Sequence, residues 1–159
     1  MRLSCLKLIS AFALLLLGLN PAARCEITDT CDGSLWDHVY HPDRLVKIHP
    51  CIWVTGTIVL KRKEADGDVH IQLKLDPKYK PLLNVTNRKR QGGNLVLEPI
   101  CVGKVTQADA KEPCQGFTNA VTIPKKGDRV KVTGSYVHDT EGGHGWMEIH
   151  PVTAIEPAE

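Results

Sequence analysis

Aromatic side chains and excess positive charge are both scarce in this chain of 159 residues. The sequence holds three Trp, three Tyr and two Phe, and one of these, Phe12, lies in an apolar stretch near the N-terminus. Lys and Arg number 20 and Asp and Glu 18, but residues 1–24 include three of the bases and none of the acids. The remainder therefore has 17 basic and 18 acidic side chains, a net charge of −1. A non-specific polyanion binder would carry a clear basic excess, so this composition disfavours nucleic acid as a partner.

Several motifs with a known chemistry are missing from the chain. It has no Cys-x-x-Cys pair, which is typical of structural zinc sites, and no His-Glu-x-x-His pair, which is typical of zinc proteases. It also lacks the Gly-x-Ser-x-Gly turn that presents a serine nucleophile. No motif therefore indicates an enzyme. We predict no cofactor, with a divalent metal such as zinc as the alternative.

The N-terminus has the charge pattern of a secretory signal. Arg2 and Lys7 precede an apolar stretch that ends at Leu19, and a proline and two alanines follow. This order predicts a signal peptide over residues 1–24, and the apolar stretch is shorter than the roughly 20 residues of a permanent span. An uncleaved membrane-anchoring helix is the alternative. No other long apolar run follows, so we expect no permanent membrane span and a secreted or periplasmic location.

The cysteines after the signal segment agree with export. Widely spaced cysteines in an exported chain usually form disulfides. Sequence cannot establish their connectivity, but proximity along the chain favours Cys31 with Cys51 and Cys101 with Cys114. Cys25 is then left over.

Residues 25–50 show no strand pattern. Ser34 can cap a short helix, and Pro42 and Pro50 interrupt the run. We therefore predict an N-terminal helical or turn segment there.

From Cys51 onward the apolar residues recur with the period of two that is typical of strands. Asp66-Gly67 between the first two runs is a strong hairpin signal. Residues 77–93 are predicted to be a long polar connection, and a helical turn is expected within 104–117. The predicted strands span residues 51–61, 69–76, 94–101, 129–137 and 146–155.

Two glycine-marked strands give this pattern a more specific character. The first strand has a central Gly56 and leads into the hairpin, and the fourth opens with Gly-Asp-Arg-Val-Lys-Val-Thr-Gly, residues 127–134. Together with five strands, these features resemble an OB-fold, a five-stranded Greek-key barrel, over residues 51–156. The stretches 66–71 and 144–152 are similar to a group of small exported OB-like proteins. We therefore expect a mostly-β chain with residues 51–159 forming an OB-like barrel.

The resemblance implies a ligand face on the outer surface of strands two and three, between the loops 61–68 and 138–145. If strands three and five are neighbours, polar side chains from three strands meet there. These candidates are His70, Gln72, Lys74, Glu98, Trp146, Glu148 and His150. His70, Glu98 and His150 have the right chemistry for a zinc-like ion and are the candidate metal ligands. The simpler interpretation is that alternating polar residues face water.

These features favour binding over catalysis. We predict an exported, non-catalytic binding or accessory module whose ligand or protein partner the sequence does not specify. One alternative is a zinc-type, metal-dependent hydrolase. Another is a binder of single-stranded nucleic acid or oligosaccharide with Trp146 as a stacking platform, although Glu98 and Glu148 on the same face oppose nucleic acid.

Overall fold

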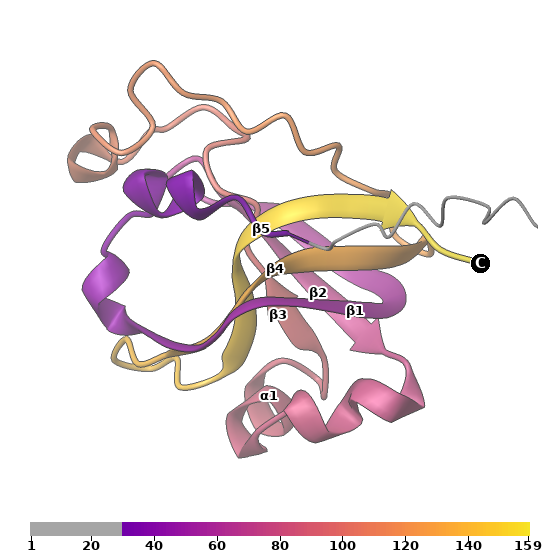
Figure 1. Ribbon diagram of the computed structural model, residues 1–159. Coiled ribbons are helices and arrows are strands. Elements are labelled where there is room, and N and C mark those ends of the chain that lie inside the picture. The colour runs from indigo at the N-terminus through magenta and orange to yellow at the C-terminus, as the bar shows by residue number, and fades with distance from the viewer. Residues whose placement is uncertain (1–29) are drawn as a thin grey trace, which may run out of the picture.

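The computed structural model describes residues 30–159, so the predicted signal peptide and Cys25 lie outside the described part of the chain. Five strands form one mixed sheet that closes in a ring in the order β1-β2-β3-β5-β4 (Figure 1). β3 and β5 run parallel, and the other neighbouring pairs are antiparallel. The chain is thus mostly β, as predicted. The strands are β1 (Leu45–Lys63), β2 (Val69–Leu75), β3 (Leu95–Leu97), β4 (Arg129–Asp139) and β5 (Met147–Pro157).

Apolar side chains from all five strands fill the inside of the ring. Ile58, Ile71, Leu97 and Ile149 are each 0% exposed. Every second side chain of a strand points to the same face, so this alternation buries one face of the sheet. β4 and β5 approach closely at Gly134, where a Cβ would lie 2.5 Å from a side-chain carbon and 2.5 Å from a backbone oxygen of β5. Glycine at this position therefore allows the two strands to pack.

The predicted hairpin at Asp66-Gly67 is confirmed. Gly67 has φ = 97°, a value that favours glycine, and β1 and β2 pair antiparallel on either side of the turn. The Glu64 N–H donates to the carbonyl of Asp68 over 2.9 Å. The turn thereby places Asp68 directly before β2. Val69 then begins the inner face of the strand and His70 the outer face.

Two disulfides join the cysteines that proximity along the sequence pairs, Cys31 with Cys51 and Cys101 with Cys114. The first ties the N-terminal segment to β1, and the second closes the loop after β3. Disulfides persist in oxidising compartments, so these bonds indicate an extracellular or periplasmic site. Within residues 30–159, no helix is long and apolar enough to span a membrane.

The N-terminal segment before the sheet is shorter than the sequence suggests, because β1 already begins at Leu45. Leu45 pairs with Asp139 of β4, so the sheet supplies backbone partners to residues that were predicted as turn. Asp32, not Ser34, caps the first helical element, since its carboxylate accepts from the Ser34 N–H over 2.9 Å. The segment contains two 3-10 helices, η1 (Gly33–His38) and η2 (Pro42–Arg44).

The long connection between β2 and β3 contains two short helices that its sequence did not indicate. Asn84 and Asn87 form a capping box in which each side chain accepts from the other residue's N–H, and this box starts α1. Over 104–117 the predicted helical turn is one short 3-10 element. The elements are η3 (Pro77–Leu82), α1 (Val85–Arg90) and η4 (Ala108–Ala110).

Candidate functional site

A row of polar side chains crosses three adjacent strands on the outside of the ring. Ile71 of β2 pairs with Leu97 of β3, and Leu97 pairs with Ile149 of β5. These three residues face inward. Because side chains alternate between faces, their chain neighbours His70, Glu98 and His150 lie on the outer face. His70 Nδ1 lies 2.7 Å from Glu98 Oε1. The structure thus brings together the three residues that the sequence singles out as possible metal ligands.

The side chains of this row are buried. The exposed fraction is 2% for His70, 8% for Glu98 and 1% for Glu148 and His150. Trp146 is 7% exposed, so its ring is not an open stacking platform. The interpretation of these residues as a polar face in water is therefore wrong.

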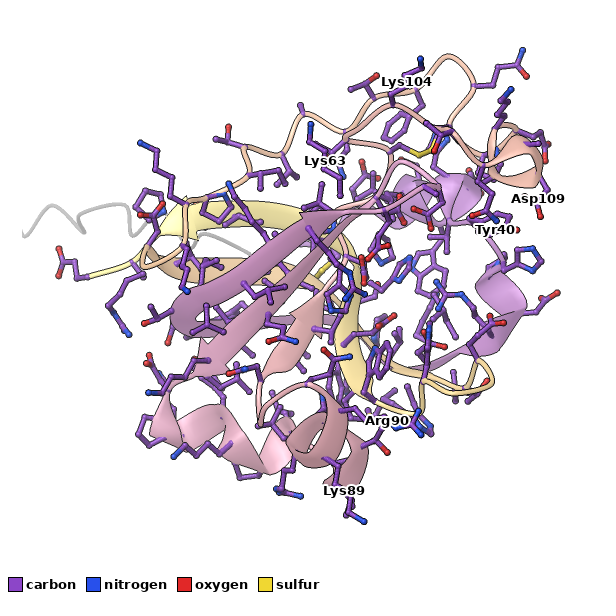
Figure 2. The ribbon with its side chains drawn as sticks, turned by 180° about the vertical axis from the view of Figure 1, so that it is seen from behind. Tyr40, Lys63, Lys89, Arg90, Lys104 and Asp109 are labelled. Atoms are coloured by element: carbon purple, nitrogen blue, oxygen red, sulfur yellow. A yellow bond between two sulfur atoms is a disulfide. The ribbon has the colours of Figure 1, made fainter. Side chains whose placement is uncertain are left out.

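Two segments pack on this outer face, namely the N-terminal segment with η1 and η2 and the loop between β3 and β4. The two segments also bind each other, since the Tyr40 hydroxyl donates to Asp109 Oδ2 over 2.7 Å and the His38 ring stacks on Phe117. Figure 2 shows Tyr40 and Asp109 side by side where the two segments meet. A second apolar cluster joins both segments to the sheet. Its buried members are Leu35, Val39, Leu45, Ile100, Cys101 and Val137.

The protonation of His70 and Glu98 follows from their neighbours. Gln91 Oε1 accepts a hydrogen bond from Gln72 Nε2 over 2.7 Å, and it lies 3.3 Å from His70 Nε2. Because Gln91 Oε1 can only accept, His70 Nε2 carries a proton and donates it. Burial lowers the pKa of His70, which keeps the ring neutral and leaves Nδ1 as an acceptor. Burial and the charge of Glu148 raise the pKa of Glu98 well above its ordinary value. The neutral Glu98 carboxyl therefore donates its O–H to His70 Nδ1.

On β5, Glu148 links Trp146 to His150. Trp146 Nε1 donates to Glu148 Oε2 over 2.8 Å, and His150 Nδ1 lies 2.9 Å from Glu148 Oε1. Burial alone would lower the pKa of His150, but the hydrogen bond to Glu148 and nearby carboxyl charges raise it above its ordinary value. His150 Nδ1–H therefore donates to Glu148. His150 Nε2 is buried and has no partner in the described part of the chain.

A narrow polar cleft of about 150 Å³ opens onto this row. Glu98 forms part of its wall, and Glu98 Oε2 is buried without a hydrogen-bond partner among residues 30–159. Four predicted site residues do not line the cleft. Gln72 donates to Gln91, Lys74 is exposed, and Glu148 and His150 are buried. The cleft is lined by Arg44, Arg62, Glu64, Asp66, Asp68, His70, Glu98, Asp139, His144 and Trp146.

Sequence reasoning missed several residues of this wall. Arg44 and Asp139 form an ion pair there, and His144 Nδ1 lies 2.7 Å from Asp139 Oδ2. No motif relates Arg44 to Asp139, because they are 95 residues apart and meet only where β1 pairs with β4. Asp68 did carry a usable signal. It lies two residues before His70, so both side chains fall on the same side of the β2 segment.

Asp68 differs from an ordinary turn aspartate in its acidity. Its Oδ1 accepts from the Cys101 N–H over 2.8 Å. Burial raises the pKa of Asp68 to about 7, against the opposing charge of His150 and together with the repulsion of Asp66. The cleft therefore combines a neutral carboxyl group on Glu98 with a second one that titrates near neutral pH. Such groups can accept a ligand's hydrogen bonds or transfer protons.

Metal-ligating atoms are less well grouped than the sequence suggests. Among residues 30–159, the set of three whose ligand atoms all lie within 4.8 Å of one another is Asp68, Cys101 and Cys114. The two sulfurs are joined in a disulfide and cannot act as thiolate ligands in that state. A metal ion held by His70, Glu98 and His150 stays a prediction.

No protein-family model matches this chain, and no curated protein matches it either. The ligand class therefore has to be inferred from the residues of the cleft themselves.

Proposed function

We propose that this chain is an exported binding module with an OB-like barrel, and that the polar cleft is its ligand site. The strand order and the parallel pairing of β3 with β5 support the barrel. The position of α1 between β2 and β3 departs from the expectation of a helix after the third strand. The N-terminal charge pattern and the two disulfides support export.

The observation that carries the binding proposal is that Glu98 lines the cleft and that its Oε2 is buried without a hydrogen-bond partner among residues 30–159. A buried polar atom without a hydrogen bond costs about 1–3 kcal/mol. A ligand that donates a hydrogen bond to this oxygen would recover that free energy. Polar groups that lack a partner inside a concave site are therefore a reason to expect a ligand.

The geometry favours a small polar ligand over a nucleic acid or an oligosaccharide. A stacking platform must present the face of an aromatic ring, whereas Trp146 is buried and its ring stacks on His144 at a centroid distance of 4.2 Å. The cleft volume of about 150 Å³ is below the roughly 300–1,000 Å³ of drug-sized ligand pockets. Only a small molecule or the end group of a larger one fits.

A titration of the ¹⁵N-labelled, disulfide-bonded protein with a library of small polar fragments tests the proposal. We expect hits that shift the amide signals of Gly67, Asp68 and Cys101, and loss of those hits in Glu98→Met, which removes the acceptor oxygen. Glu112→Gln, which replaces an exposed acid outside the cleft, is the matched control. Fragments that bind only elsewhere on the protein would contradict the assignment of the cleft.

A hydrolase is the second candidate, because the Asp68 carboxyl has a pKa of about 7 beside a neutral Glu98. Catalytic acids and bases work best with a pKa near the operating pH. The test is hydrolysis of chromogenic ester, phosphodiester and glycoside substrates, each with and without added zinc. Activity that falls about 100-fold or more in Asp68→Asn would favour this candidate, in line with general acid–base contributions. Equal activity of the two proteins would exclude it.

A further inference from the structure

We propose that the cleft binds a cationic nitrogen group, an ammonium or a guanidinium, through the carboxyl groups of Asp66, Asp68 and Glu98. The inference rests on the proposed binding function and names its ligand class. The cationic group can belong to a free small amine or to a Lys or Arg side chain of a partner protein.

The two arginines in the cleft wall are already paired. Arg44 forms an ion pair with Asp139, which is 1% exposed, and Arg62 Nε lies 2.6 Å from Glu64 Oε1. Each guanidinium therefore has its own carboxylate partner. Neither arginine forms an ion pair with the remaining acids of the cleft.

Three carboxyl groups of the wall form no ion pair with a Lys or Arg side chain among the described residues. Asp66 Oδ1 accepts from the Asp68 N–H over 3.1 Å, and Asp68 Oδ1 accepts from the Cys101 N–H over 2.8 Å. Glu98 Oε1 is occupied by His70. The other carboxyl oxygens, Asp66 Oδ2, Asp68 Oδ2 and Glu98 Oε2, have no hydrogen-bond partner within residues 30–159. For Glu98 this oxygen is buried, and the side chain is 10% exposed.

Hydrogen-bond chemistry decides which ligand fits these oxygens. All three are acceptors, and an ammonium offers three donors and a guanidinium five. A hydrogen bond in which one partner is charged is roughly twice as strong as one between neutral groups. An anionic ligand would meet carboxyl groups at close range, and a neutral ligand would form only the weaker hydrogen bonds.

The spacing of the acids favours an organic cation over a bare metal ion. Asp66, Asp68 and Glu98 do not form one of the sets of ligand atoms that lie within 4.8 Å of one another in the described chain. A metal ion needs oxygen atoms at about 2.0–2.6 Å around one point. A guanidinium has five N–H donors on three nitrogens, so it reaches oxygens that are placed more widely than those around one metal ion, whereas an ammonium nitrogen can donate to one or two of the three.

The experiment uses pairs of probes of equal shape and different charge, titrated into the ¹⁵N-labelled, disulfide-bonded protein at constant ionic strength. Butylammonium is compared with butanol, and methylguanidinium with methylurea. Calcium and zinc chlorides form a metal arm. We expect only the organic cations to shift the amide signals of Gly67, Asp68 and Cys101 strongly.

Variants locate the effect. Loss of one charge-assisted hydrogen bond corresponds to a weakening of about tenfold or more, so Glu98→Met, which removes the acceptor oxygen, should raise the Kd for butylammonium by that factor. Asp66→Asn keeps the turn-forming oxygen and removes one charge, which gives a second test if the first variant does not fold. Glu112→Gln is the control and should bind like the wild type. N-acetyl-lysine-methylamide distinguishes a free amine from a protein side chain as the source of the cation. If it binds more tightly than butylammonium, the ligand is a side chain of a partner protein; if it binds more weakly, the ligand is a free amine.

Two results would overturn the inference while leaving the binding function in place. One is that butanol and methylurea shift the cleft amides as strongly as the cations do. The other is that the metal ions shift those amides and the organic cations do not. If no probe or polar fragment of any charge shifts them, both the inference and the proposed function fail.

Discussion

Replacing Asp68 by asparagine tests the electrostatics of the cleft in the absence of any ligand. Asn keeps the oxygen that accepts from the Cys101 N–H, so the change removes mainly the ionisable proton. The pKa of Asp68 is about 7 in the folded protein, against an ordinary value of 3.8. The folded state therefore holds this proton more tightly than the unfolded state does.

The sign and size of the effect follow from this difference. Between pH 4 and pH 7 the folded state binds more protons at Asp68 than the unfolded state, so its contribution to the free energy of unfolding falls as pH rises. Each pH unit corresponds to 1.36 kcal/mol, so the full window of about three units amounts to roughly 4 kcal/mol. Asp68→Asn should match the wild type near pH 3, below both pKa values, and be more stable by about 2–4 kcal/mol at pH 8.

Urea unfolding followed by tryptophan fluorescence at half-unit pH steps measures this difference directly. Asp37→Asn, which replaces an exposed aspartate, is the control and should leave the pH profile of stability unchanged. Parallel profiles for Asp68→Asn and the wild type would refute the argument, because they would mean that the Asp68 carboxyl has the same proton affinity in the folded and unfolded states.

Three further changes test the packing and the cross-links. Gly134→Ala should lower the free energy of unfolding by about 1–3 kcal/mol, because its Cβ would overlap atoms of β5, and an unchanged Tm would contradict that close approach. Arg44→Met should cost about 3 kcal/mol or more in urea unfolding, because it leaves the buried Asp139 carboxylate without its cation. Adding Asp139→Asn should recover part of this loss, and no recovery would exclude the ion pair as its cause. Replacing Cys101 and Cys114 together by serine should cost about 3 kcal/mol, since their separation is 13 residues; equal stability of this variant and the oxidised wild type would show that the bond adds nothing.

Much of the sheet could be predicted from local physical chemistry. Alternating apolar residues indicate strands, because successive side chains point to opposite faces, and Asp66-Gly67 indicates a hairpin, because glycine tolerates a positive φ. These two rules place β2 within a residue of its observed limits and locate the first turn. The start of β1 was missed because Leu45 joins the sheet through pairing with Asp139, which no local pattern contains.

The candidate site was predicted in part. The row of His70, Glu98 and His150 follows from alternation along each strand and from strands three and five being neighbours. Lys74 was predicted for the same face, but it is exposed and does not line the cleft. The acidity of Asp68 was not foreseen, because an aspartate next to glycine has a sufficient explanation in turn formation.

The sequence by itself determined that this chain is mostly β, since alternation is a property that short segments carry. The structure settled which cysteines pair. Only the tertiary structure decided that the polar row is buried, because a strand with alternating polar residues has the same pattern whether its outer face meets water or protein. The protein that packs there comes from residues 33–44 and from the loop after β3, held by two disulfides and an apolar cluster. Burial then changed the chemistry of the row, raising the pKa of Asp68 and Glu98 and leaving one carboxyl oxygen without a partner. The features that indicate a function in this molecule are therefore products of its packing.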